Sequence, residues 1–578
     1  MSEMRRAALA TIVCAAPLVC AAAHASGGLL EAQTLREAAH HEVRPAAPGP
    51  VMPLPLPETR VPATTPASAA ELASIARVRG PRRVLVGVRE HADLARVARA
   101  LRELGAAPEA FGPIGVLAAN VPSGAALVRA LDGDRRVAYI ERDRRLRIAA
   151  DPFDVPDPAH GGLKFTWFFD EVRAAAALSA AGGGSRRSIA VMDTGLDVSH
   201  PELAGRVAGT YDTRTGGRHV TDRVGHGTFV SGLIAAVDGN GIGGKGVAGN
   251  TRVFAIRGSR DGGFSETDLL RGIAFALKRG ADVLNLSIAG DRVDSSVARA
   301  LGLAFYNDVL PVAASGNRGE EGNPAQFPAV VLGGSRGASG IGLSVGATRP
   351  DGAPAGFSTH NEFVSLAAPG ASGSDCRFGV FSTLPAAGGT DWDSPDSCSS
   401  VFGAPGAPRF AYGEGTSFSA PIVSGIAAVT WQVEPRLASE QVADVLIRSA
   451  RQTLGTGWNE FTGAGIVDGG AAALLARRYD VTPPRARGRA RRRGDRVRVS
   501  VARTRDRTES GREKAGAVRY SLFVSRDGGH RLKVVRNGRR RPLSLTMRLR
   551  GRRANVFLAM ACDANGNCDL ERLGRFRR

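Results

Sequence analysis

The feature that most constrains this chain is a run of small residues around a serine, residues 415–421 (GTSFSAP), directly before an apolar stretch that reaches Val433. A proline such as Pro421 fits the first turn of a helix, where its missing N–H costs little, and residues 422–433 have the apolar character of a buried helix. The pattern therefore predicts a helix that begins close to Ser417. A side chain at that position lies near the positive end of the helix dipole.

A serine hydroxyl is a weak nucleophile near neutral pH, so it needs a base, and the base needs an acid that orients it. Two upstream segments contain these residue types. Residues 188–195 (SIAVMDTG) predict a short buried strand with Asp193 at its end, and residues 225–228 (GHGT) place His226 at the start of an apolar helix. Open α/β sheets hold their sites at the carboxyl ends of strands, so Asp193 and His226 are candidates to act with Ser417.

These three motifs, in the order Asp, His, Ser, resemble those of the subtilase family of serine peptidases over about residues 185–475. The resemblance implies an α/β catalytic domain with a doubly wound, mostly parallel sheet. In such a domain Ser417 attacks a peptide carbonyl, His226 carries the proton and Asp193 orients the imidazole. It also implies a secreted serine endopeptidase that acts on polypeptides, needs no cofactor for its chemistry and works as a monomer.

The same resemblance assigns further site residues. Asn317, at the end of residues 311–317 (PVAASGN), matches the side-chain donor of the oxyanion hole. Residues 283–290 (VLNLSIAG) match the strand that pairs with an extended peptide, although Ala289 stands where the family usually has glycine. The expected substrate-binding residues are Ser287, Ile288, Ala289, Gly290, Ala314 and Gly316.

Each of these motifs taken alone also fits an ordinary turn or helix N-cap. A catalytically inactive subtilase scaffold, which acts as an adhesion or binding protein through its C-terminal region, is therefore the alternative. The mutation Ser417→Ala separates the two, because it abolishes hydrolysis and leaves adhesion intact.

The N-terminal part of the chain has the pattern of an exported precursor. Residues 1–25 combine Arg5 and Arg6 with an apolar run and a small-x-small ending, which is typical of a cleaved export signal. We expect this signal at 1–25, an Ala- and Pro-rich linker without a core at 26–80, an α+β unit at 81–149, the catalytic domain at 150–478 and a basic β domain at 479–578.

Residues 81–149 alternate between strand and helix patterns. Val84, Val86 and Val88 alternate as in a strand, residues 94–104 carry leucines and a valine at helical spacing, and residues 137–143 predict another strand. The unit resembles the inhibitory propeptide of subtilases, which implies that its tail occupies the active-site cleft until it is cut near residues 148–151. A small α+β domain of unrelated role is the alternative.

Four cysteines remain once Cys14 and Cys20 leave with the signal. An even number in an exported chain indicates disulfides, and we expect the local pairs Cys376–Cys398 and Cys562–Cys568.

The family resemblance also suggests a structural calcium site. Residues 238–248 (DGNGIGGKGVA) match the spacing of a calcium loop found in many subtilases, and Glu202 stands where a further carboxylate is often offered. Oxygen donors suit this ion. The candidate ligands are Glu202, Asp238, Asn240, Ile242 and Gly244, with a glycine-rich turn as the alternative and Lys245 as an unfavourable neighbour.

The positive charge of the chain lies at its C-terminus. Residues 481–578 contain 29 Lys and Arg against 8 Asp and Glu, a difference of +21 that equals the net charge of the whole chain. Short strand patterns there predict a small β-sandwich, similar to fibronectin type III-like modules. The positive charge of this region has two explanations. It suits binding to an anionic cell-envelope surface, or it reflects a general bias of the composition in which arginine replaces lysine. The lack of aromatic residues among the arginines argues against nucleic acid.

Overall fold

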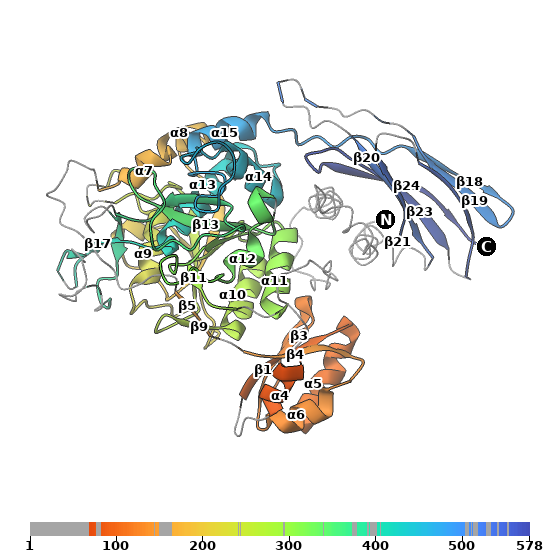
Figure 1. Ribbon diagram of the computed structural model, residues 1–578, viewed down its shortest axis with the longest axis horizontal. Helices are drawn as coiled ribbons and strands as arrows, with labels where there is room; N and C mark the ends of the chain where they lie inside the picture. Colours follow the sequence, from red (N-terminus) through yellow and green to blue (C-terminus); the bar gives the residue numbers. More distant parts are fainter. Residues whose placement is uncertain are drawn as a thin grey trace. The chain divides into compact units, whose positions relative to one another are not determined.

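A computed structural model of the 578-residue chain is shown in Figure 1. The structure describes all residues except 1–68, 77–81, 144, 149–164, 241, 243, 293–294, 339, 373–378, 390–391, 393–400, 405, 503, 505–507, 510, 513–517, 527–532, 540–542 and 552–553. The described chain divides into two compact units with a boundary between Arg477 and Arg478.

A parallel sheet forms the centre of the larger unit, with the strand order β14-β13-β12-β10-β6-β8-β7. Every residue of β6, β10, β12 and β13 is buried, as in parallel sheets that are covered on both faces. The predicted α/β fold class is therefore confirmed. The strands are β6 (Ser188–Asp193), β7 (Val207–Asp212), β8 (Arg252–Arg257), β10 (Val283–Leu286), β12 (Leu310–Ala314), β13 (Leu343–Thr348) and β14 (Leu366–Pro369).

Helices cover both faces of this sheet. Met192 lies against Gly272 of α10, whereas the next residue, Asp193, lies against Gly227 of α9. Because successive strand residues point to opposite faces, α9 and α10 lie on opposite sides of the sheet. Helix α13 packs beside α9, and α11 packs beside α10. The helices of this unit after residue 165 are α7 (Trp167–Glu171), α8 (Ala174–Ala180), α9 (His226–Ala235), α10 (Glu266–Arg279), α11 (Ser295–Tyr306), α12 (Ala329–Leu332), α13 (Thr416–Val433), α14 (Ser439–Ser449) and α15 (Gly469–Arg478).

Two small antiparallel sheets lie outside the parallel one. The first has the order β11-β5-β9 and the second the order β15-β17-β16. Their strands are β5 (Arg145–Ile148), β9 (Gly263–Ser265), β11 (Ile288–Ala289), β15 (Val380–Leu384), β16 (Val401–Phe402) and β17 (Arg409–Gly413).

The helix expected near Ser417 exists, but it begins earlier than the proline suggested. Helix α13 starts at Thr416, so Pro421 lies in its second turn and not in the first. A proline there cannot donate to the carbonyl four residues earlier, which is that of Ser417. The Ser417 carbonyl instead accepts a hydrogen bond from Ser287 Oγ at 2.7 Å.

Residues 82–142 form a sheet of order β2-β3-β1-β4 with two helices, as the α+β pattern predicted. One expectation was wrong, because residues 69–76, assigned to the linker, form helix α4. Its residue Ile75 is fully buried in the core of this subdomain. The elements are α4 (Ala69–Ala76), β1 (Arg82–Val88), α5 (Leu94–Glu103), β2 (Glu109–Phe111), β3 (Val116–Val121), α6 (Gly124–Leu131) and β4 (Val137–Arg142).

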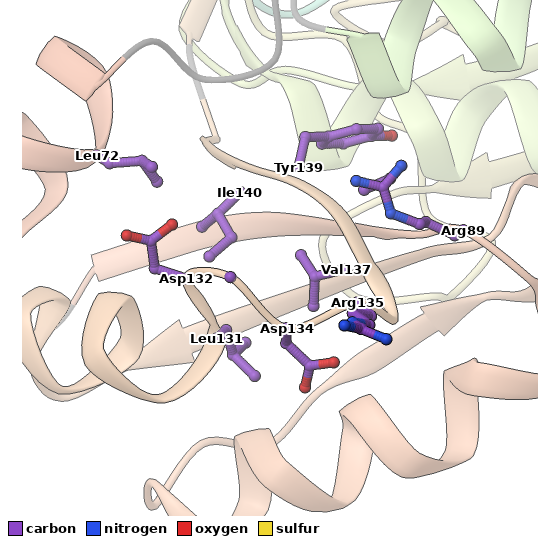
Figure 2. A pocket seen from close by; sticks show the side chains of 11 residues that line it. Leu72, Arg89, Leu131, Asp132, Asp134, Arg135, Val137, Tyr139 and Ile140 are labelled. Atoms are coloured by element: carbon purple, nitrogen blue, oxygen red, sulfur yellow. The ribbon is translucent and has the colours of Figure 1, made fainter.

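A pocket of about 520 Å³ lies in this subdomain and not at the candidate catalytic residues (Figure 2). Leu72 of α4, Arg89 and residues between 131 and 140 line it. Its carboxylate Asp134 is held by Arg136, whose hydrogen bonds lower the pKa of Asp134 to about 2. Asp134 therefore belongs to the local structure of the turn before β4.

The smaller unit contains two antiparallel sheets, β18-β19-β22 and β21-β20-β23-β24. Their apolar side chains share one core, which includes Val497, Val499, Tyr520 and Phe557, so the predicted two-sheet sandwich is present. The strands are β18 (Gly488–Arg493), β19 (Arg496–Val501), β20 (Arg519–Ser525), β21 (Lys533–Arg539), β22 (Ser544–Arg548), β23 (Asn555–Cys562) and β24 (Cys568–Phe576).

One of the two predicted disulfides is confirmed. Cys562 and Cys568 are bonded where β23 and β24 end and begin. The other pair, Cys376 and Cys398, lies outside the described residues, as does the expected export signal. Among the helices that the structure describes, none is both long and apolar enough to cross a membrane.

Candidate active site

The candidate catalytic residues meet at one edge of the parallel sheet. Asp193 is the last residue of β6, Ser287 follows β10, and Asn317 comes three residues after β12. These strands are neighbours in the order β12-β10-β6. The site therefore lies at the carboxyl ends of adjacent parallel strands, where α/β proteins hold their reactive groups.

His226 is fixed against Asp193. It is the first residue of α9, and its Nδ1 lies 2.7 Å from Asp193 Oδ1. Both side chains are fully buried. The approach depends on Gly227, because a Cβ at that position would lie only 2.2 Å from the carbonyl oxygen of Gly195. A glycine is thus required beside the histidine to bring α9 this close to the end of β6.

Asp222 ties the same two elements together. Its Oδ1 accepts hydrogen bonds from Thr194 Oγ1 at 2.8 Å and from the Gly225 N–H at 2.8 Å. Its Oδ2 accepts two more from the N–H and the hydroxyl of Thr228, both at 2.8 Å. Since Thr194 is next to Asp193 and Gly225 is next to His226, this buried carboxylate sets the spacing of the pair.

Ser417 is the second residue of α13 and exchanges hydrogen bonds with Ser287. Its Oγ donates to the Ser287 carbonyl at 3.3 Å, and Ser287 Oγ donates back to the Ser417 carbonyl. A buried chain continues from there, because Asn285 Nδ2 donates to Ser287 Oγ and Ser424 Oγ donates to Asn285 Oδ1, each at 3.0 Å. The turn of α13 that carries Ser417 is thus anchored to the end of β10.

Asn317 is oriented by the residue before the serine. Its Oδ1 accepts from the N–H of Thr416 at 3.0 Å and from the Thr416 hydroxyl at 2.7 Å. The Gly316 N–H donates to the same hydroxyl at 3.1 Å. Because its oxygen is occupied by Thr416, the amide NH₂ of Asn317 points away from Thr416.

The expected peptide-binding strand is paired with the chain's own residues 145–148. Strand β5 runs antiparallel to β11, with Ile148 opposite Ile288, and antiparallel to β9, with Leu146 opposite Phe264. The other expected binding residues lie around this position. Ala289 and Ala314 are buried, Gly290 pairs with Phe327, and Gly316 precedes Asn317.

The subdomain before β5 binds the helices behind the site. The Glu141 carboxylate accepts from the N–H of Ser295 at 3.2 Å and of Ser296 at 3.1 Å, at the start of α11. Asp143 accepts from the N–H of Thr267 at 2.8 Å, at the start of α10. Carboxylates are favoured at helix N-termini. Burial raises the pKa of Asp143, although its bonds to Thr267 and the charge of Arg83 oppose that shift.

The candidate metal ligands are only partly gathered. Glu202 is fully buried, neither of its carboxylate oxygens has a hydrogen bond of ordinary geometry, and burial raises its pKa to about 7 despite the nearby Asn240 amide. Gly244 lies 3.9 Å from this carboxylate, measured from the position of a Cβ. Asp238 and Asn240 are exposed, as is Ile242, whose N–H donates to Asn240 Oδ1.

The donor set around Glu202 suits a hard cation that also takes backbone oxygens. Among the described residues, no three His, Cys, Asp or Glu side chains gather closely enough to hold a metal by themselves. An unpaired buried carboxylate beside a glycine-rich loop fits calcium, which accepts carbonyl ligands. Lys245 does not compete for the carboxylate, because its Nζ lies over the ring of Phe169 at 4.1 Å.

The sequence motifs did not identify Asp222 or the orienting role of Thr416. Asp222 stands four residues before His226, and an acidic residue just before a helix start is a recognisable capping signal. Thr416 is within the serine motif, but its contact with Asn317 joins residues 99 positions apart. Only the folded chain reveals such a pair.

The chain is similar to a known family of proteins and to several of its members. Residues 184–465 match the subtilase family (Peptidase_S8). The chain is 29% identical to the thermophilic serine proteinase of Bacillus sp. (strain AK1) over 62% of this chain and 82% of that protein. It is 31% identical to the M-protease of Shouchella clausii (strain KSM-K16) over 60% of this chain and 76% of that protein. Against subtilisin E of Bacillus subtilis (strain 168), the identity is 29% over 60% of this chain and 78% of that protein.

Loss of the Asp222 carboxylate is expected to weaken Ser417 as a nucleophile. In Asp222→Ala, the four hydrogen-bond donors described above lose their acceptor, so His226 and Asp193 shift apart. Because a misplacement of about 1 Å costs up to roughly a hundredfold in rate, we expect a fluorophosphonate probe to label Ser417 about tenfold to a hundredfold more slowly.

The control is Asp468→Ala, which also removes a buried carboxylate. Asp468 accepts from the Ala471 N–H at 2.8 Å and pairs with Arg173, away from the site. Both variants should lose thermal stability, but only Asp222→Ala should label slowly. Equal labelling rates, measured per folded molecule, would show that Asp222 has no positioning role.

Proposed function

The chain belongs to the subtilase family and is a subtilisin-like serine endopeptidase, and we propose on that premise that it hydrolyses proteins through a triad of Ser417, His226 and Asp193. The observation that carries the proposal is the 2.7 Å contact between His226 Nδ1 and Asp193 Oδ1 at the sheet edge that also holds Ser417. A carboxylate at Nδ1 leaves Nε2 as the basic nitrogen of the imidazole.

The proposed reaction has two halves. Ser417 Oγ attacks the peptide carbonyl while His226 Nε2 takes its proton, and Asp193 stabilises the imidazolium that forms. The imidazolium then protonates the leaving amine as the peptide C–N bond breaks, which leaves an acyl-enzyme. Water attacks the ester, His226 takes the water proton and returns it to Ser417 Oγ, and the acid product departs.

Asn317 would stabilise the oxyanion in both halves. Its Oδ1 is held by Thr416, so the NH₂ group is already oriented when charge develops on the substrate oxygen. A donor that needs no reorganisation lowers the barrier more than a mobile one. The N–H of Ser417, at the start of α13, would be the second donor.

We also propose that residues 82–148 are an inhibitory propeptide. Their last strand, β5, occupies the edges of β9 and β11 that a substrate would use, and Ser417, His226 and Asp193 are fully buried with this strand present. The chain would therefore be exported as an inactive precursor and mature by its own cleavage.

The strand register suggests where that cleavage occurs. Ile148 is opposite Ile288, and the residue before Ile288 is Ser287, whose carbonyl is 3.3 Å from Ser417 Oγ. If the antiparallel register continued by one residue beyond Ile148, the next residue of the chain would lie opposite Ser287. The carbonyl carbon of Ala149 is therefore the expected target, and the cut would fall between residues 149 and 150.

A structural calcium ion is proposed at Glu202. Glu202 and the oxygens of the loop at Asp238, Asn240, Ile242 and Gly244 would hold it, and its role would be to neutralise a buried carboxylate and fix the loop. No step of hydrolysis passes through it.

Self-processing is the direct test of the proposed function. Purified wild-type protein should acquire a new N-terminus at residue 150, and Ser417→Ala should keep the uncut chain, because no acyl-enzyme can form. Intact mass and N-terminal sequencing measure both. Processing of Ser417→Ala at the same rate as wild type would refute the triad, and a first wild-type cut anywhere other than between residues 149 and 150 would refute the register.

Asn317→Ala should lower kcat by about two to three orders of magnitude with little change in KM, because the lost donor acts on charge that exists only in the transition state. Peptide hydrolysis per titrated active site measures this. The matched control is Asn307→Ala, which removes an amide bonded to the Leu303 carbonyl on α11 and should leave kcat unchanged. A drop in the control of similar size would point to a general folding defect.

Calcium removal should destabilise the catalytic domain. At a calcium concentration 100 times its Kd, binding is worth about 2.7 kcal/mol, so the thermal midpoint should fall by several degrees in EDTA. Glu202→Gln should lose most of that response, whereas Glu321→Gln, which changes an exposed carboxylate, should keep it. A calcium response that survives in Glu202→Gln would rule out this site.

A further inference from the structure

One sheet of the C-terminal sandwich carries arginines in cross-strand register on its outer face. In β19, Val497, Val499 and Val501 are buried in the core, so the alternating residues Arg496 and Arg498 point outward. The register sets Arg498 opposite Arg491 of β18, Arg496 opposite Arg493 of β18, and Arg496 also opposite Arg548 of β22.

With Arg489, which lies opposite Ser500, these residues form a continuous cationic surface that we call the arginine face. All its arginines are exposed. The arginine face consists of Arg489, Arg491, Arg493, Arg496, Arg498 and Arg548.

This arrangement is unfavourable for the isolated protein. Directly opposed residues of an antiparallel pair have Cβ atoms only about 5 Å apart, and like charges in that position destabilise a sheet. Among the described residues, the single carboxylate bonded to the arginine face is Asp495, 2.9 Å from Arg548. Composition can raise the number of arginines, but it does not align them across three strands on one face.

The opposite face of the sandwich differs. On β24, Arg572 lies opposite Leu558 and Arg575 lies opposite Val556, so neither faces another arginine across the strand pair. Within the described register of this second sheet, one arginine pair does occur, Arg519 opposite Arg539, whereas the β18-β19-β22 sheet has three such pairs across its three strands. A counter-charge supplied from outside would relieve its repulsion.

We propose that the arginine face binds a flexible linear polyanion whose charges are phosphate groups, such as a phosphodiester polymer or a polyphosphate chain. Guanidinium groups bind phosphate oxygens in a bidentate manner. Along a strand, successive outward residues are about 6.7 Å apart, so one chain of phosphates can meet several arginines in turn. The hydroxyls of Ser500, Ser544 and Thr546 lie between them in register and add neutral donors.

The arginine face lacks the side chains that would bind nucleic-acid bases or insert into a lipid bilayer. Its outward positions hold arginine, serine and threonine, so no aromatic ring is available on which a base could stack. No large apolar side chain occupies them either, so nothing would insert into a bilayer. A flexible phosphate chain needs only charge and hydrogen-bond donors.

The test compares Arg491→Gln/Arg498→Gln with wild type in the full chain, with Ser417→Ala in every sample to prevent processing. The probe is long-chain sodium polyphosphate, and binding is titrated at several salt concentrations. Removing two opposed arginines should weaken binding at least roughly tenfold and should lower the slope of log K against log salt by about 1.4, at 0.7 per phosphate contact. Binding of poly(glycerol phosphate) should fall in the same way.

Two matched variants separate the site from net charge and from folding. Arg572→Gln/Arg575→Gln removes the same charge from β24 and should leave affinity within about twofold. Arg491→Lys/Arg498→Lys keeps the charge, so it should keep the salt slope but lose affinity severalfold. The thermal midpoint of Arg491→Gln/Arg498→Gln should not fall, because a like-charge pair is removed.

Several outcomes would overturn the proposal. Equal losses in the β24 control would reduce the effect to net charge, and a lower thermal midpoint in Arg491→Gln/Arg498→Gln would make these arginines structural. Tighter binding to duplex DNA, to vesicles with 30% phosphatidylglycerol or to polyglutamate than to polyphosphate would assign the face to another partner.

The two phosphate polymers distinguish the source of the ligand. Poly(glycerol phosphate) binding tighter than polyphosphate binding would identify an envelope polymer as the source, and the reverse order would identify free polyphosphate.

Discussion

The candidate site depends on the close approach of helix α9 to the end of strand β6. Gly227 lies so near the Gly195 carbonyl that any side chain there would collide with it. Only this proximity lets His226 Nδ1 come within 2.7 Å of Asp193 Oδ1. Asp222 then holds the two elements at that distance through Thr194 on one side and Gly225 on the other. The pair is thus rigid before any substrate arrives, as a preorganised site requires.

A second constraint comes from the proline in α13. Pro421 removes one helical hydrogen bond, and the Ser417 carbonyl that loses its partner accepts one from Ser287. A local defect of the helix therefore becomes a tertiary contact between the turn that carries the serine and the end of β10. From β10 the network continues through Asn285 to Ser424, one helical turn beyond Pro421. The position of Ser417 is set by the sheet as well as by its helix.

The N-terminal subdomain contacts helices and strands of the catalytic domain from outside. Glu141 and Asp143 bind the starts of α11 and α10, and the strand that follows them lies between β9 and β11. The carboxylates gain from the helix dipoles, while Asp143 is also desolvated, so its pKa rises. Binding through helix ends and strand edges uses main-chain groups that a folded catalytic domain presents in any case. Such contacts would suit the proposed propeptide, which would have to bind tightly and still be removed.

The sequence by itself determined the local chemistry. Asp193, His226 and Ser417 became candidates through short motifs, because glycine, proline and apolar periodicity act over a few residues, and Asn317 became one through the resemblance of residues 311–317 to a subtilase motif. The Cys562–Cys568 bond and the two-sheet C-terminal module followed from local patterns as well, and the α/β class followed from the family resemblance. The tertiary structure alone decided the rest. Helix α4 was missed because its buried residue Ile75 gains stability only by packing against the subdomain core. The links from Thr416 to Asn317 and from Asp222 to Thr194, and the alignment of Arg491 with Arg498, join side chains whose proximity depends on strand register and helix placement. Strand register and helix placement are set by packing between distant segments, so no local sequence pattern predicts them.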